Sequence, residues 1–405
     1  MTATAVVTGL GIVAPNGLGA EEFWKSTLAG ESGLDRITRF DPAQYPSRIA
    51  GEVPGYRAEE HIPSRLMPQT DHMTRLAITA ADWAIADSGA DPAKLPEYGM
   101  SVVTAASAGG VEFGQRELQA LWSQGKEYVS AYQSFAWFYA VNTGQISIRH
   151  GMRGPSGVLV SEQAGGIDSL GLARRHIRKG FALCVSGGVD GAICPWGWVP
   201  QIATGLLSTV DDPARAFLPF SARASGYVPG EGGAILVVED AQSARARGAE
   251  RVYGEIAGYA ATLDPRPGSG RPPALRRCVA NALADASVTA GDIDVVFADG
   301  AGVPELDLIE AETLAAVFGP GAVPVTAPKS MTGRLLGGGS SLDVATALLA
   351  LRDGVVPPTA NVAGPAPEYP IDLVTEAREA PLRTALVIAR GHGGFNAALV
   401  VRTVS

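Results

Sequence analysis

Cysteine and histidine are scarce in this sequence of 405 residues, and their scarcity excludes two kinds of site. The three cysteines are an odd number without zinc-like spacing, so we expect neither a disulfide framework nor a zinc centre. Free thiols fit a reducing cytoplasm. None of the five histidines has a partner at metal-binding spacing, and the glycine-rich stretches are too short for a dinucleotide or phosphate-loop fingerprint. We therefore predict a cytoplasmic protein that uses no metal and no other cofactor.

Charge is sparse as well, and long apolar runs are missing. Charged residues make up 18% of the chain and the formal net charge is −9, so the basic face of a nucleic-acid-binding protein is not expected. The best candidate for a membrane span, residues 181–203, is interrupted by Asp190 and two prolines, and the N-terminus lacks the basic start of a signal peptide. An apolar content of 46% instead predicts a sizeable folded core.

One compact group of basic residues ends the pattern of an expected helix. It consists of Arg174, Arg175, Arg178 and Lys179. Two interpretations remain open for this group. It is either a solvated helix end, which suits the helix dipole, or a docking patch for an acidic partner.

Short apolar runs that end at glycines alternate with longer helical patterns. Because strands that are apolar on both faces belong in sheets covered by helices, the sequence predicts an α/β protein. The expected strands lie at residues 5–7, 100–104, 181–185, 234–238, 295–297, 385–389 and 397–401.

Two segments resemble each other and predict two similar halves. Residues 165–180 (GGIDSLGLARRHIRKG) and 339–354 (GSSLDVATALLALRDG) both begin with small residues and carry an Asp behind an aliphatic residue. Each is expected to be a helix entered through a small-residue turn. The polar stretch around residues 240–251 separates an N-terminal half, residues 1–245, from a C-terminal half, residues 246–405. The proline-rich residues 264–273 are expected to form a surface loop.

Five motifs, in order along nearly the whole chain, resemble those of ketosynthases in the thiolase superfamily. They are VTGLGIVAPNG, GPSGVLVSEQAGGIDS, YVPGEGGAILVVED, APKSMTGRLLGGGSSLD and GHGGFNAALVV. The resemblance implies a thiolase-like fold, in which the two similar halves form a layered αβαβα architecture.

The positions that carry catalysis in active ketosynthases are substituted in this sequence. Gln163 stands where the family has its cysteine nucleophile, and an amide cannot form a thioester. Asp299 and Arg334 stand where the family has two histidines, and together they could form an ion pair. Three charged positions of the family pattern are retained: Asp307, Glu310 and Lys329. Because the three charged positions are retained while the nucleophile is missing, the sequence predicts a structural or modulating role.

Glutamine in a SEQAGG turn is typical of the chain-length factors of type II polyketide synthases. These are the non-nucleophilic partners of active ketosynthases. The resemblance implies a heterodimer of two thiolase-like subunits with a channel at their interface, where a growing poly-β-ketone lies. An acyl carrier protein would bring malonyl units to this complex and carry the polyketide chains.

Two other functions remain open. In the first, the chain is a malonyl-carrier-protein decarboxylase, in which the Gln163 amide stabilises the enolate oxygen from a helix N-terminus. In the second, the chain is a scaffold that only stabilises the ketosynthase. A different nucleophile is not expected, because Cys184 lies in an apolar strand pattern and neither Cys194 nor Cys278 opens a helix.

Val111, Gly114 and Leu118 recur at helical spacing within residues 110–122. On an ordinary amphipathic helix this stripe would face the core. In chain-length factors, however, the matching segment lines the end of the polyketide channel, and bulky aromatic residues there shorten the product. The resemblance therefore makes these three residues length-determining. Their small side chains leave a longer channel, and a close-packed channel wall does not move aside for a growing chain. The sequence therefore predicts a long product, a decaketide or longer.

Two further features have alternative interpretations. Residues 128–139 (YVSAYQSFAWFY) form a dense aromatic segment, for which burial in a large dimer interface is a better explanation than a simple core segment. His392 lies in the C-terminal glycine loop, where active relatives carry a gating phenylalanine. It is either satisfied within the loop or lines the former site.

Overall fold

The computed structural model describes residues 3–266 and 268–404, and the order of its elements is that of an α/β protein. The main sheet contains β1 (Ala5–Ala14), β2 (Gly17–Leu18), β5 (Met100–Ala105), β6 (Ser156–Leu159), β7 (Leu183–Asp190), β8 (Gly232–Asp240), β9 (Gly254–Leu263), β10 (Val295–Phe297), β11 (Pro324–Thr326), β13 (Asp372–Leu373), β15 (Thr384–Gly391) and β16 (Phe395–Arg402). Two short pairs stand apart from it: β3 (Leu34–Arg36) with β4 (Ile49–Gly51), and β12 (Val355–Val356) with β14 (Arg378–Glu379). The helices are α1 (Ala20–Leu28), α2 (His72–Ser88), α3 (Val111–Ser123), α4 (Gln133–Ala136), α5 (Val141–His150), α6 (Gly165–Arg178), α7 (Pro195–Ala203), α8 (Pro213–Ala216), α9 (Ala241–Ala246), α10 (Leu275–Ala286), α11 (Pro304–Phe318) and α12 (Gly339–Asp353).

The main sheet consists of two runs of strands with the same order. The N-terminal run is β6–β5–β7–β8–β1 and the C-terminal run is β11–β10–β15–β16–β9, and the two join where β1 pairs with β9. In each run the three strands farthest from the joint are parallel and the remaining pairs are antiparallel. The repeat in the sequence is therefore a repeat of topology.

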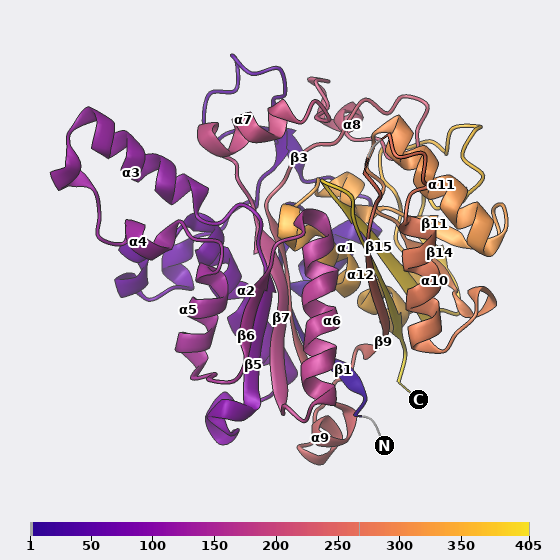
Figure 1. Cartoon of the computed structure of the whole chain (residues 1–405), viewed down its shortest axis with the longest axis horizontal. Coiled ribbons are helices and arrows are strands. Elements are labelled where there is room, and N and C mark those ends of the chain that lie inside the picture. The colour runs from indigo at the N-terminus through magenta and orange to yellow at the C-terminus, as the bar shows by residue number, and fades with distance from the viewer. Residues whose placement is uncertain (1–2, 267, 405) are drawn as a thin grey trace.

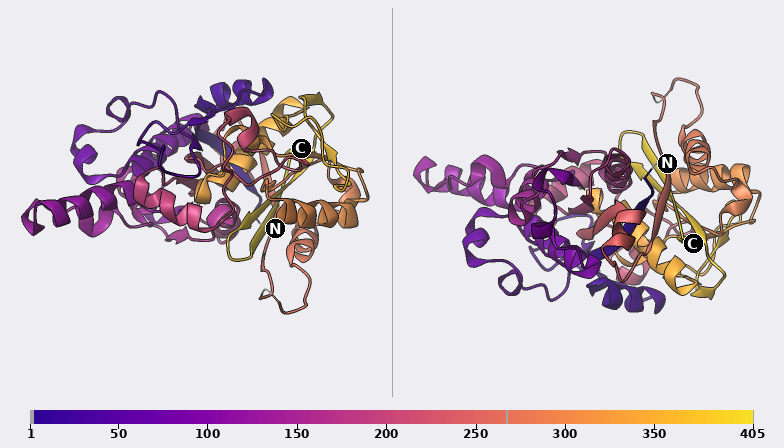
Figure 2. Two further views of the ribbon diagram at one scale, coloured as in Figure 1. Left: turned by 90° about the horizontal axis from the view of Figure 1, so that it is seen from above. Right: turned by 90° about the horizontal axis from the view of Figure 1, so that it is seen from below.

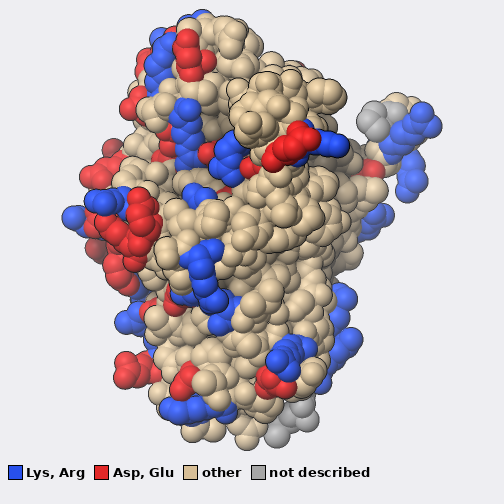
Figure 3. Space-filling model, turned by 90° about the vertical axis from the view of Figure 1, so that its left-hand side faces the viewer, with Lys and Arg blue, Asp and Glu red and all other residues tan. Residues whose placement is uncertain are grey.

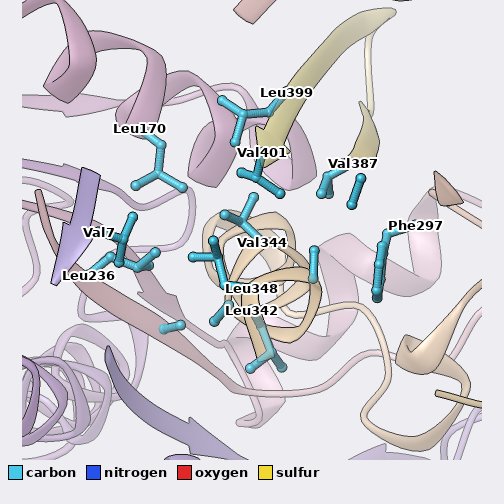
Figure 4. Packing of buried hydrophobic residues seen from close by; sticks show 14 of the residues in the cluster. Val7, Leu170, Leu236, Phe297, Leu342, Val344, Leu348, Val387, Leu399 and Val401 are labelled. Carbon is cyan, nitrogen blue, oxygen red and sulfur yellow. The ribbon is translucent and has the colours of Figure 1, made fainter. Parts of the chain in front are cut away.

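Helices cover both runs and also separate them. α6 and α12, the two repeated segments, pack together in the middle, while α2 covers the outer face of the N-terminal run and α10 that of the C-terminal run (Figure 1). Figure 4 shows Val344 and Leu348 of α12 in the centre of the core. Around them lie Leu170 of α6 and strand residues of both runs, such as Val7 and Val401. This is the expected αβαβα arrangement of a thiolase-like fold.

The expected elements are present. Every expected strand lies in or overlaps a strand of the main sheet, and residues 165–180 and 339–354 contain α6 and α12. The described residues of 264–273 form an exposed loop between β9 and α10, and residue 267 lies outside the described residues. The polar stretch 240–251 contains α9, and the division at residues 245 and 246 stays a prediction. Across residues 3–266 and 268–404, no helix combines the length and the apolar character that crossing a membrane requires.

Candidate functional site

Gln163 lies in a short 3-10 turn, Glu162–Ala164, that leads directly into α6. Its side chain is 1% exposed and packs against Gly339, the first residue of α12. A Cβ atom at position 339 would overlap the Gln163 amide oxygen, so glycine is needed to leave room for this side chain. The amide nitrogen has no hydrogen-bond partner in the described part of the chain. The expected nucleophile position is thus an amide buried where the two central helices begin.

Asp299 and Arg334, which the motifs align with the two histidines of active ketosynthases, form a buried ion pair. The Arg334 guanidinium lies 2.9 Å from the Asp299 carboxylate, and the residues are 6% and 1% exposed. Burial alone would raise the pKa of Asp299, but the charges of Arg334 and Lys329 outweigh burial and hold that pKa below its usual value. The structure therefore contains the ion pair that the sequence suggested between these two residues.

Further contacts hold this ion pair in place. Arg334 donates to the backbone oxygen of Arg390 at 2.8 Å, and its guanidinium lies 5.5 Å from the centre of the Tyr227 ring. The backbone N–H of Arg390 donates to Asp299 at 3.0 Å. An arginine and an ion-paired carboxylate do not exchange protons near neutral pH as an imidazole does, so neither residue of this pair can supply that kind of general acid–base catalysis.

The retained carboxylates order the loop that follows β10. Asp307 accepts hydrogen bonds from the backbone N–H groups of Phe220 and Gly302, at 2.8 and 3.0 Å. Glu310 accepts from those of Asp299 and Gly300, at 2.7 and 2.9 Å. Burial raises the pKa of both carboxyl groups to about 7, and the nearby charge of Asp299 adds to the rise for Glu310. Both residues thus act on the backbone that presents Asp299.

Lys329 links the site to the second central helix. Its ammonium group donates to the backbone oxygen of Ala298 at 2.6 Å and pairs with Asp343 of α12 at 2.9 Å. In the repeated segment, α6 carries Asp168, which accepts the Tyr259 hydroxyl at 2.8 Å. The two aspartates of the sequence repeat therefore both anchor a partner from the surrounding structure.

A cavity of about 180 Å³ lies beside the ion pair. It is lined by Glu162, Leu206, Tyr227, Asp264, Ala301, Leu306, Arg334 and residues 390–395. This volume is below the roughly 300–1,000 Å³ of ordinary ligand pockets. Gln163 is not part of the lining, so the residue at the nucleophile position does not face this space.

One residue that lines this cavity was not singled out by the sequence. Glu162 has a positive φ of 51°, and its carboxylate accepts the backbone N–H of His392 at 2.9 Å. Burial raises the pKa of Glu162, although the charge of Arg334 opposes the rise. His392 itself is exposed and lines the cavity. Together with Tyr227 and Arg390, Glu162 completes the site, and only its place beside Gln163 in the sequence could have indicated it.

The cysteines are not alternatives to Gln163. All three thiols are buried and free, and burial raises the pKa of Cys184 and of Cys278 to about 12. The expectation that none opens a helix is wrong for Cys194, whose sulfur caps α7 by accepting the backbone N–H of Gly197. Burial raises its pKa as well, so this helix N-terminus does not produce a reactive thiolate.

The predicted length-determining residues lie on α3, which projects from one end of the molecule (Figure 2). Val111 is half-buried and Leu118 is 37% exposed. The inward side of the helix is formed instead by Phe113, Gly114 and Glu117. The interpretation as an ordinary core stripe is therefore wrong for Leu118, because the helix extends beyond the core.

Gly114 allows a tryptophan to pack directly on this helix. A Cβ atom there would lie 2.9 Å from the Trp196 ring. The backbone N–H of Trp196, at the start of α7, donates to the Gln115 side chain of α3 at 2.6 Å. α7 thus braces α3, and the wall around Gly114 is already filled by an indole ring.

Aromatic residues beside α3 remain exposed. Tyr128, Tyr132, Trp137, Phe138 and Tyr139 are between 37% and 63% exposed. Figure 3 looks onto this end of the molecule and shows a broad area without charged side chains, with Lys, Arg, Asp and Glu gathered toward its margins. The alternative that these residues are simple core is wrong, because the segment packs along the outside of the N-terminal half. We call this area the aromatic face.

The basic group at the end of α6 is not entirely solvated. Arg174 is 5% exposed and pairs with Asp285 of α10 at 2.5 Å. Arg175, Arg178 and Lys179 are exposed. Arg174 therefore belongs to the packing between α6 and α10. The other three are at the exposed helix end, where the docking patch stays a prediction.

Family models and curated proteins match most of this chain. The beta-ketoacyl synthase N-terminal and C-terminal domain models match residues 3–244 and 253–363. A tetracenomycin polyketide synthase ketoacyl synthase beta subunit from Streptomyces glaucescens is 63% identical, over 99% of this chain and 98% of its own. An actinorhodin polyketide putative beta-ketoacyl synthase 2 from Streptomyces coelicolor is 60% identical over 98% of each chain.

Two solved structures have the same fold over their whole length. The ishigamide ketosynthase/chain length factor superimposes with a TM-score of 0.90 at 28% identity, covering 100% of both chains. A type II acyl-carrier protein in complex with its ketosynthase, bound to the hexaketide, contains a chain that superimposes equally well at 26% identity, again over 100% of both.

Proposed function

Since the chain belongs to the beta-ketoacyl synthase family and, within it, to the ketosynthase beta subunits of type II polyketide synthases, we propose that it is the chain-length-determining partner of an active ketosynthase. The heterodimer would condense malonyl units from an acyl carrier protein, with loss of carbon dioxide. The nucleophile comes from the partner, and this chain shapes the channel. The ketosynthase/chain length factor and the carrier-protein complex among its structural relatives support both partners.

One observation carries the non-nucleophilic part of the proposal. Gln163 is buried at the nucleophile position, and the Asp299–Arg334 ion pair occupies the two histidine positions. A condensing enzyme needs a thiolate to hold the acyl group, and this site has none; at the two predicted histidine positions it has an ion pair in place of imidazole proton donors. The retained Asp307, Glu310 and Lys329 support a role in keeping the fold around the former site.

The channel-shaping part of the proposal is supported by the position of α3. Leu118 is exposed and Val111 is half-buried, next to the aromatic face, and a partner that covers this face would enclose them. Residues at such a boundary meet a chain that lies between the subunits. We propose that Val111 and Leu118 set the length at this boundary, and that Gly114 contributes from the inward side by letting the Trp196 ring pack against α3. The small side chains of the three residues would allow a decaketide or longer.

Replacing two central residues of the aromatic face with aspartate, Trp137→Asp with Phe138→Asp, is expected to weaken heterodimer formation by about a hundredfold or more. Buried aromatic anchors dominate interface energies, and each aspartate would place an unpaired charge there. Co-purification with the ketosynthase and size-exclusion chromatography measure the effect. Val252→Asp provides a matched control, because Val252 is exposed away from this face. Equal recovery of the double variant and the control would show that the partner binds elsewhere.

Intact-protein mass spectrometry tests the absence of a nucleophile. The heterodimer is incubated with malonyl- and acyl-loaded carrier protein, and we expect an acyl adduct on the ketosynthase and none on this chain. The expected mass of this chain is unchanged because its three thiols are buried and Gln163 cannot form a thioester. A stable acyl adduct on this chain would contradict the proposal that it lacks a nucleophile.

The decarboxylase alternative is tested in a parallel reaction that contains this chain without the ketosynthase. The unpartnered amide nitrogen of Gln163 is the one feature that favours it, since a free donor could stabilise an enolate. Its burial outside the cavity argues against access. With this chain alone, malonyl groups should stay intact on the carrier at the same rate for wild type and Gln163→Ala. Decarboxylation that disappears in Gln163→Ala would favour the alternative.

A further inference from the structure

A groove of about 860 Å³ runs between α10 and α11, and the Asp299–Arg334 ion pair is not part of its lining. Its apolar lining includes Leu263, Ala280 and Ile309, together with the prolines that precede α10. Three arginines line the same groove: Arg271, Arg276 and Arg277. We refer to it as the arginine groove.

These arginines are exposed, and none forms an ion pair within residues 3–266 and 268–404. The chain as a whole has a net charge of −9, so a groove with more arginines than carboxylates is a local exception. Arg276 and Arg277 also lie in the first turn of α10, and this turn contains no acidic residue. A helix N-terminus disfavours positive charge. Binding of an anionic partner would explain why two arginines lie at this helix N-terminus.

Two acidic residues, Asp264 and Glu312, also line the groove, so the three arginines leave one positive charge in excess. Asp264 is engaged, since it accepts the backbone N–H of Ala274 at 2.7 Å and the Asn396 side chain at 2.9 Å. Glu312 of α11 is exposed and has no ion pair in the described part of the chain. The groove thus combines an apolar floor with an excess of guanidinium groups, which suits an acidic protein surface with some apolar side chains.

The position of the groove leaves it open in the proposed heterodimer. α10 and α11 lie at the end of the molecule opposite α3 and α4, so a partner on the aromatic face does not cover them (Figure 1). Asp264 lines both the arginine groove and the cavity near Arg334. A protein docked in the groove therefore stands next to the mouth of the former site.

From these observations we infer that the arginine groove docks the acyl carrier protein on this subunit, where the carrier is held without reacting. The inference rests on the proposed function, because that function brings the carrier to the complex. The phosphodiester that joins the carrier to its pantetheine arm is anionic, and arginine pairs with phosphate and carboxylate groups through two parallel hydrogen bonds. The Asp299–Arg334 ion pair and the buried Gln163 leave no thiol to accept the acyl group.

Charge reversal in the heterodimer tests this inference. With malonyl-loaded carrier protein as the probe, calorimetric titration of the wild-type heterodimer should give two carriers, one on each subunit. Arg276→Glu with Arg277→Glu should reduce the number to one, or weaken the second site by about tenfold or more at low ionic strength. The same reversal at the solvated end of α6, Arg175→Glu with Arg178→Glu, is the control and should leave both carriers bound.

A second pair of variants locates the carrier directly. Arg276→Lys with Arg277→Lys keeps the charge and should keep the second carrier, while its amines allow zero-length cross-linking to carrier carboxylates. Cross-linked peptides that join α10 to the carrier are the expected result. Unchanged stoichiometry and affinity after charge reversal, or cross-links that place the carrier only on the ketosynthase, would overturn the inference. Product length is measured separately, so failure of the length-control proposal would not be mistaken for failure of docking.

Discussion

Val111→Phe combined with Leu118→Phe is expected to shorten the polyketide that the reconstituted heterodimer releases by at least one malonyl-derived unit. Both positions lie on the outward side of α3, and both have room for a larger side chain because they are not buried within this chain. The opposite side cannot retreat, since Phe113 and Glu117 are buried and the Trp196 ring already covers Gly114. Added volume must therefore project toward the partner and into the space where a growing chain would end.

Product masses from the two heterodimers provide the measurement. The matched control places two phenylalanines on another side of the same helix, Gln119→Phe with Ser123→Phe, where both native residues are exposed. This control should release the wild-type product. If the Val111 and Leu118 variant also releases the wild-type product at a normal rate, α3 does not set the length, and the scaffold function becomes the better explanation.

Arg334→Met is expected to lower the free energy of unfolding by about 3–5 kcal/mol, the usual effect of removing one partner from a buried ion pair. Asp299 would then keep a charge in a buried place, with Lys329 as its remaining nearby cation. The loss of the contacts with Tyr227 and with the Arg390 backbone adds to the effect. Urea unfolding of the heterodimer at one fixed protein concentration measures the change.

The double variant Asp299→Asn with Arg334→Met supplies the control for this prediction. It removes both charges while keeping an oxygen that can accept the Arg390 N–H. We expect it to recover most of the lost stability, since replacing both partners of a buried pair is often close to neutral. A loss below about 1 kcal/mol in Arg334→Met alone would mean that water reaches the Asp299 carboxylate and that the ion pair does not stabilise the site.

Much of the fold follows from patterns that depend on local sequence. Apolar runs that end at glycines predicted β1, β7 and β15, because strands buried on both faces must be apolar throughout. The repeat of small residues predicted α6 and α12, whose close approach requires them. β9 was missed because its segment is rich in glycine and alanine and poor in β-branched residues, so it resembles a strand only when its neighbours are in place.

The candidate site was predictable where a motif fixes a position and less so where distant segments meet. Gln163, Asp299 and Arg334 could be assigned from motifs, but their burial and the 2.9 Å ion pair depend on how β10 and the segment before α12 come together. Arg174 shows the opposite case. Both interpretations of its basic group, a solvated helix end and a docking patch, placed it at the surface, whereas contact with Asp285 of α10 buries it. Burial of a charged side chain is decided by tertiary partners that local patterns do not reveal.

The aromatic face also has a consequence for the amounts in which the two subunits are made. A copy of this chain without its ketosynthase would present tyrosine, tryptophan and phenylalanine side chains to water over a broad uncharged area. Surfaces of this kind drive self-association at cellular concentrations. Excess copies would be lost to aggregates or to proteolysis, and a shortage would leave the ketosynthase uncovered. Balanced synthesis of the two chains is thus a requirement imposed by the surface of the folded protein.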